Sequence, residues 1–118
     1  MWYSRIKVGI LEIDMDHCNI DTMLQLYFAG TVTEAYLENV IDALIAHFGH
    51  EEDVIVQMGL TFPEEHRVEH QRLIRFLESL IDQWKAGKAD GKSLADDVRT
   101  LLLHHVSEYD VKLSATAP

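Results

Sequence analysis

Residues 37–58 read LENVIDALIAHFGHEEDVIVQM, and this stretch decides the fold. Apolar side chains recur in it every three or four residues, which is typical of an α-helix with one buried face. His47 and Glu51 fall on the same face as these apolar residues. Burying a polar side chain without a partner costs on the order of 2–7 kcal/mol. The stretch therefore predicts both a packed helix and a polar site within the core.

Three further segments show the same helical periodicity, and capping signals set their limits. The expected helices span residues 14–29, 31–58, 61–85 and 93–114. Their expected start signals are Asp14, Thr31 with Glu34 or Thr33 alone, Thr61 with Glu64, and Ser93 with Asp96. Their expected stop signals are Gly30, Gly59 and Gly87. Pro63 would lie in the first turn of the third helix, where proline is tolerated.

The fold class follows from these four segments. No run of alternating β-branched residues predicts a strand. Helices joined by short connections favour antiparallel neighbours, so we expect an all-α, up-down-up-down four-helix bundle. An extended N-terminal arm, residues 1–12, would precede it and carry Trp2, Tyr3, Val8 and Ile10.

Composition places limits on partners and location. The chain has 118 residues, enough for one domain over residues 1–118, and a net charge of −10. So acidic a surface argues against nucleic acid or an anionic membrane as a partner. Cys18 is the single cysteine, which excludes an internal disulfide and fits a reducing compartment. Because no apolar run approaches the roughly 18 residues of a membrane span and no secretion signal is recognised, we expect a cytoplasmic protein.

Seven histidines are unusual in an acidic chain of this length. Two of them, His50 and His104, fall on polar helix faces and are expected to face solvent. The other five share the apolar faces of the expected helices: His17, His47, His66, His70 and His105. A core holding five imidazoles and a carboxylate would be costly unless each group had a partner.

The spacing of these residues indicates what that partner is. His47 and Glu51 are separated by four residues, and so are His66 and His70. This spacing directs both side chains of a pair to one point on a helix face. A metal ion would convert each buried polar group into a ligand, so the pattern predicts a metal site in the bundle core.

Asp110 is a further candidate, although its spacing is irregular. It follows His105 by five residues, which places it about 140° away on a regular α-helix. A local π-type bulge would bring both side chains to the centre. The alternative is His104 with Glu108, which have regular spacing but lie on the polar face; we favour His105 with Asp110.

Several motifs follow one another in a characteristic order. They are Trp2 seven residues before Gly9, Ile13-Asp14-x-x-His17, His47-Phe48-x-x-Glu51-Glu52, His66-x-x-x-His70, and His105 with Asp110 five residues on. This order resembles the hemerythrins, specifically the single-domain bacteriohemerythrins, over essentially the whole chain. The resemblance implies a non-haem di-iron centre within a four-helix bundle.

The resemblance also assigns roles to residues. Three histidines would bind one iron: His66, His70 and His105. Two would bind the other: His17 and His47. Glu51 and Asp110 would bridge the ions together with an oxo or hydroxo group. The apolar O2 pocket of the family would be formed here by Ile20, Phe48 and Leu102. Leu101 and Ile55 stand where the family usually has Trp and Met.

Counting the ligands indicates a function. Five imidazoles, two bridging carboxylates and one bridging oxygen fill all but one position of two six-coordinate ions, and the open position lies on the ion with two histidines. Imidazole and carboxylate ligands without thiolate suit iron or manganese, and six-coordination argues against structural zinc. One open position suits a small ligand, so we expect reversible O2 binding for carriage, storage or buffering.

Three other functions stay open from the sequence. The first is a di-iron enzyme, either a peroxidase or a reductase of O2 or nitric oxide, since Leu101 and Ile55 would widen the pocket. The second is an oxygen or redox sensor that acts through a partner protein. The third and weakest is iron storage or delivery, because a cage of seven ligands would release iron slowly.

Overall fold

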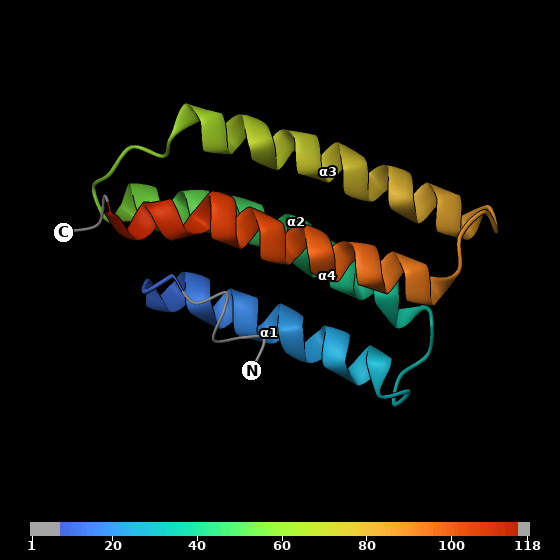
Figure 1. Cartoon of the computed structure of the whole chain (residues 1–118). Helices are drawn as coiled ribbons and strands as arrows, with labels where there is room; N and C mark the ends of the chain where they lie inside the picture. Colours follow the sequence, from blue (N-terminus) through green and yellow to red (C-terminus); the bar gives the residue numbers. More distant parts are fainter. Residues whose placement is uncertain (1–7, 116–118) are drawn as a thin grey trace.

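The computed structural model describes residues 8–115, with the side chains of residues 8–113. Figure 1 shows four long helices lying side by side, with consecutive helices running in opposite directions. They are α1 (Leu11–Phe28), α2 (Tyr36–Gln57), α3 (Glu64–Lys85) and α4 (Gly91–Glu108), followed by the 3₁₀-helix η2 (Asp110–Ala115). No strand occurs among the described residues. The predicted all-α four-helix bundle is confirmed.

Each helix contributes its apolar face to one core. Ile13 of α1, Leu44 of α2, Leu77 of α3 and Leu102 of α4 are all fully buried. Burial of one such side chain contributes about 1.5–3 kcal/mol, so the stripes predicted from periodicity account for the helix packing. Of the predicted N-terminal arm, Val8 and Ile10 are buried against this core, whereas Trp2 and Tyr3 lie outside the described residues.

The expected helix stops are confirmed, but the expected start of α1 is wrong. Gly30, Gly59 and Gly87 follow the helices with φ between +75° and +81°, a left-handed conformation that glycine adopts without strain. Helix α1 begins at Leu11, so Asp14 lies inside its first turn. The Asp14 carboxylate accepts hydrogen bonds from the backbone N–H groups of Val8, at 2.6 Å, and Gly9, at 3.1 Å. It therefore fastens the preceding segment to α1.

The expected starts of the other helices also need correction, and at α2 a tertiary contact uses a residue that was expected to cap. Helix α2 begins at Tyr36 without a side-chain cap. The carboxylate of Glu34 instead accepts the backbone N–H of Gly91 at the start of α4, at 3.1 Å. Helix α3 has no side-chain cap either, and Pro63 precedes its first residue. In α4, Asp90 is the cap and accepts the backbone N–H of Ser93 at 2.7 Å.

The predicted π-type bulge before Asp110 is wrong, because a change of helix type replaces it. Helix α4 ends at Glu108, and Tyr109 has φ −120° and ψ −57°, outside helical geometry. The tighter 3₁₀-helix η2 then begins at Asp110 and turns its carboxylate into the bundle, where it is fully buried.

One end of the bundle holds the polar core residues. Helices α1 and α3 begin at this end, and α2 and α4 finish there (Figure 1). The i,i+4 pairs therefore come from the last half of α2 and the first half of α3. Among the described residues, no helix is long and apolar enough to cross a lipid bilayer.

Candidate metal centre

Seven polar side chains meet inside this end of the bundle. All are buried, none being more than 3% exposed. They are His17 from α1, His47 and Glu51 from α2, His66 and His70 from α3, His105 from α4, and Asp110 from η2. The sequence predicted each of these residues to point inward, and the structure brings all seven together. Metal binding itself stays a prediction.

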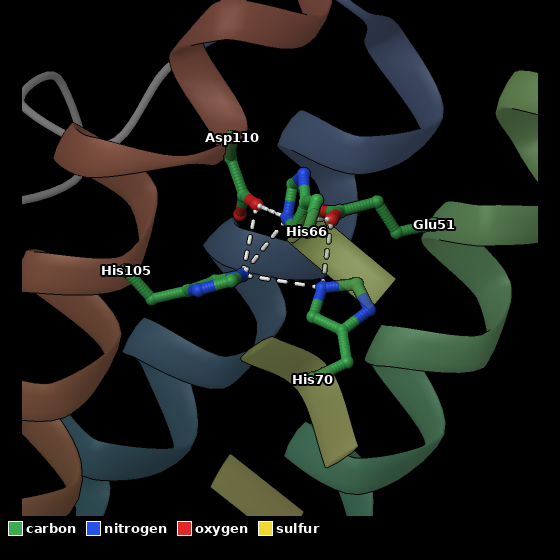
Figure 2. A group of neighbouring side chains, drawn as sticks. All are labelled: Glu51, His66, His70, His105 and Asp110. Atoms are coloured by element: carbon green, nitrogen blue, oxygen red, sulfur yellow. Dashed lines mark hydrogen bonds and ion pairs between the residues drawn. The ribbon is translucent and has the colours of Figure 1, made fainter. Parts of the chain in front are cut away.

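The seven residues form two overlapping groups, within each of which the potential ligand atoms lie within 4.8 Å of one another. The first group has three histidines and is drawn in Figure 2: His66, His70 and His105 with Glu51 and Asp110. The second has two histidines: His17 and His47 with the same two carboxylates. We call them the three-His group and the two-His group. Glu51 and Asp110 are shared between them.

Each shared carboxylate turns one oxygen to each group. Glu51 Oε1 lies 3.0 Å from His66 Nε2 and 3.1 Å from His70 Nε2, whereas Oε2 lies 3.3 Å from His47 Nε2. Asp110 Oδ1 lies 2.8 Å from His66 Nε2 and 3.0 Å from His105 Nε2. Its Oδ2 lies 3.1 Å from His17 Nε2. Two carboxylates that bridge a pair of metal ions would have this arrangement.

The distances between the potential ligand atoms suit metal coordination. The imidazole Nε2 atoms also approach one another, at 3.1 Å for His17 and His47 and 3.2 Å for His105 with each of His66 and His70. Bonds of about 2.1 Å to an octahedral metal ion separate neighbouring ligand atoms by about 3.0 Å. The observed separations of 2.8–3.3 Å match the edges of such a polyhedron.

The hydrogen bonding of these atoms is incomplete without a cation. In the described part of the chain, both oxygens of Glu51 and both oxygens of Asp110 are buried without a hydrogen-bond partner. A buried carboxylate needs hydrogen-bond donors or an opposite charge, and these oxygens meet only the facing imidazole nitrogens. When two Nε2 atoms face each other, a hydrogen bond between them needs a proton on one and a lone pair on the other, so only one of the two can be protonated. A metal ion would satisfy all of these atoms at once, so the residues present fit a metal.

Outer carboxylates fix the imidazoles of two helices. His47 Nδ1 lies 2.9 Å from Asp16 Oδ2, and His70 Nδ1 lies 2.9 Å from Glu52 Oε2. Because an ionised carboxylate only accepts hydrogen bonds, each Nδ1 carries the proton and donates it. In the neutral ring, Nε2 is then left with a lone pair that points at the centre, the form that a metal requires.

The pKa values of two histidines are raised and those of both shared carboxyl groups are lowered, as expected for closely paired opposite charges. Burial lowers the pKa of His47, but its hydrogen bond to Asp16 and its close contact with the Glu51 carboxylate outweigh burial and raise the pKa to about 9. Burial also lowers the pKa of His66, and its contacts with Asp110 and Glu51 raise it to about 9. Burial and the charge of Asp110 raise the pKa of Glu51, yet the neighbouring histidines bring it down to about 2. Metal uptake would therefore displace protons from the imidazoles.

The pKa of Asp110 is held well below its ordinary value. Burial raises it, but the imidazoles of His105, His17 and His66 outweigh burial. Both shared carboxylates are therefore ionised near neutral pH, which is the state that binds a metal ion.

A model of the hemerythrin HHE cation binding domain matches residues 8–116. The chain belongs to the hemerythrin family. The two overlapping groups thus form a candidate metal centre of hemerythrin type.

The relatives that the chain matches are distant in sequence. It is 27% identical over 108 residues to a bacteriohemerythrin of Stenotrophomonas maltophilia, covering 86% of this chain and 68% of the relative. It is 24% identical over 116 residues to a bacteriohemerythrin of Pseudomonas paraeruginosa, covering 93% of this chain and 76% of the relative. A hemerythrin-like protein of Naegleria gruberi is 21% identical over 111 residues, covering 94% and 87%. No solved structure matches the chain.

Apolar side chains surround the candidate metal centre. The three residues predicted to line an O2 pocket are all buried: Ile20, Phe48 and Leu102. The Phe48 ring stacks on His70, with 4.6 Å between ring centroids. Phe62, which sequence reasoning did not single out, lies 4.7 Å from His66 and 5.4 Å from His70 by the same measure. These rings cover part of the three-His group with apolar surface.

Other contacts of the candidate metal centre were not predicted. Asp16 and Glu52 were not identified as partners of the histidines, although both stand directly beside a candidate ligand in the sequence. Tyr109 stacks on His105, with 5.3 Å between ring centroids. The sequence signal that could have identified Tyr109 is its position next to the candidate ligand Asp110. As expected, His50 and His104 are exposed, and neither belongs to the two groups.

Proposed function

We propose that the chain holds two iron ions at the seven residues and binds O2 reversibly. The observation that carries the proposal is the division of each shared carboxylate, with one oxygen facing the three-His group and the other facing the two-His group. His66, His70 and His105 would hold one ion, and His17 and His47 the other. Glu51 and Asp110 would bridge the ions, together with an oxo or hydroxo group.

The donor set supports iron. It combines neutral imidazole nitrogens with carboxylate oxygens, and Cys18, the only cysteine, is not part of either group. A pair of ferrous ions would supply two electrons and one open coordination position, on the ion with two histidines. A single open position would suit a small ligand such as O2.

The protein side chains would control what reaches that position. Ile20, Phe48 and Leu102 would exclude water, because their buried surfaces offer no hydrogen bonds. Asp16 and Glu52 would keep His47 and His70 in the Nδ1-protonated form. An apolar lining next to fixed ligands would favour reversible binding, because it would limit the water that reaches the site.

Reconstitution with ferrous iron tests the proposal. The metal-stripped protein is loaded anaerobically with Fe²⁺, exposed to air and then deoxygenated. We expect two iron ions per chain and strong near-ultraviolet and visible charge-transfer bands that appear with O2 and disappear on its removal. A colourless protein that holds a single zinc ion would overturn the proposal.

A cavity favours a second candidate, a di-iron enzyme that acts on peroxide, O2 or nitric oxide. This cavity of about 350 Å³ lies between α3 and α4, and both Leu101 and His105 line it. It would bring a small molecule against one of the candidate ligands. Sustained consumption of peroxide with a reductant would support this function, and a long-lived oxygenated state would favour O2 binding.

A further inference from the structure

Two hydrogen bonds in series connect the two-His group to the surface, through Asp16 of α1 and His50 of α2. Asp16 of α1 accepts at one oxygen, Oδ2, from His47 Nδ1 at 2.9 Å and from His50 Nδ1 at 2.5 Å. Exposure increases outward along this path. The side chain of His47 is 1% exposed, that of Asp16 24% and that of His50 47%.

The chemistry of the carboxylate and the two imidazoles determines which groups donate these hydrogen bonds. The Asp16 carboxylate has no proton, so both imidazoles donate their Nδ1–H to it. Hydrogen bonds to an ionised acceptor are roughly twice as strong as neutral ones. A single bond to His47 would leave the partly exposed Asp16 free to turn towards water in another rotamer. The second bond, from His50, holds the carboxylate where His47 needs it.

We propose that Asp16 and His50 form a positioning pair that fixes the ring of His47 and thereby sets metal affinity in the two-His group. The inference rests on the metal centre proposed above, and it concerns one of the two positions. His50 acts through Asp16 and binds no metal itself. His50 is exposed, as its sequence position predicted, yet its side chain acts on the site through the carboxylate of Asp16.

The three-His group has a separate anchor of similar design. Glu52 Oε2 accepts from His70 Nδ1 at 2.9 Å, and Glu52 Oε1 accepts from Arg67 Nε at 3.1 Å. In both cases a carboxylate from a neighbouring helix orients a buried ring while a partly exposed donor holds the carboxylate. Since the two anchors share no residue, loosening one is expected to affect one metal position only.

The protein offers matched variants for a test. His50→Ala removes the outer donor, whereas His50→Asn keeps an N–H donor near the position of the imidazole Nδ1. His104→Ala is the control, because His104 is also exposed and also stands beside a candidate ligand, yet has no carboxylate hydrogen bond among those found in the described residues. Arg67→Ala is the reciprocal variant for the other anchor.

The experiment is an anaerobic Fe²⁺ titration of the full chain against a competing chelator. Loss of a partner that orients a ligand typically costs 10–100-fold in metal affinity. Because His50→Ala leaves Asp16 in place and removes only its second donor, we expect the variant to weaken one of the two binding steps by up to about tenfold and to leave the other unchanged. His50→Asn and His104→Ala should behave like the wild type, and Arg67→Ala should weaken the other step. Anomalous diffraction from crystals at one Fe²⁺ per chain would identify the occupied group.

Two results would overturn the inference. The first is a His50→Ala variant that loads both ions as tightly as the wild type, and the second is an equal loss in His104→Ala. If the wild type binds no iron pair, the proposed function fails, and crystal structures of metal-free variants still test the positioning pair. His50→Ala should then lose the 2.9 Å contact between Asp16 and His47. A contact preserved in that variant would refute the role of His50.

Discussion

Raising the pH of the metal-stripped protein from 6.5 to 9 is expected to destabilise it. The pKa of His47 rises from 6.5 to about 9 in the folded chain, where Asp16 and Glu51 outweigh the effect of burial. A raised pKa means that the folded protein binds the proton more tightly than the unfolded chain. The stabilisation is therefore complete below pH 6.5 and is lost as the pH rises through about 9.

The size of the effect follows from this shift. Each pKa unit corresponds to about 1.36 kcal/mol, so His47 alone accounts for about 3 kcal/mol. His66 shifts in the same direction, but it shares Glu51 with His47, so the two contributions overlap. For a domain of this size, a loss of about 3 kcal/mol lowers the melting temperature by roughly 10 °C.

The carboxylates set the acid limit of the same stability window. The pKa of Glu51 falls to about 2 because the neighbouring histidines outweigh burial and the charge of Asp110, and the pKa of Asp110 also falls. Their stabilisation is present above the ordinary carboxyl pKa and is lost as the pH falls through the folded value. The metal-stripped protein should therefore be most stable between about pH 4.5 and 6.5.

Thermal unfolding followed by circular dichroism at pH 6 and pH 9 is the assay. His47→Gln should flatten the pH dependence, and the exposed control His104→Gln should preserve it. Iron-loaded protein should lose the dependence as well, since a metal-bound ring carries no Nε2 proton. A metal-stripped wild type that melts at the same or a higher temperature at pH 9 would refute the reasoning.

Three further predictions concern the ligands, the core and a helix cap. His105→Ala should lose iron in elemental analysis while His104→Ala keeps it, because only His105 lies in the candidate centre; equal iron in both variants would contradict the ligand choice. Leu102→Ala should cost about 2–5 kcal/mol in urea unfolding, because it leaves a cavity at a fully buried position; a cost below about 1 kcal/mol would mean that the core closes around the gap. Asp90→Ala should cost about 0.5–2 kcal/mol in the same assay by removing the α4 cap, and an unchanged midpoint would show that the bond to Ser93 contributes nothing.

Periodicity predicted the helices and the inward direction of the candidate ligands, because both depend only on spacing along one helix. The i,i+4 pair His66 and His70 needs no tertiary information to share a face. His105 with Asp110 is favoured over His104 with Glu108 because the latter two lie on the polar face of the helix. The means of bringing His105 and Asp110 together, a 3₁₀-helix that follows α4, depends on how the chain end packs and was predicted wrongly.

The helix starts and the outer hydrogen bonds depend on contacts between elements. Asp14 and Glu34 both carry oxygens suited to capping, but Asp14 bonds the segment before α1 and Glu34 bonds α4. Likewise, Asp16 and His50 meet across α1 and α2, 34 residues apart in sequence. The relative rotation of two helices decides such a contact, and a pattern read along one helix does not contain it.

Anomalous diffraction at the iron edge, from crystals reconstituted with Fe²⁺, tests the central claim most directly. The account predicts two iron ions within the bundle, one against His66, His70 and His105 and the other against His17 and His47. Glu51 and Asp110 should each contact both ions. A single ion, or iron bound only at the surface, would contradict the account.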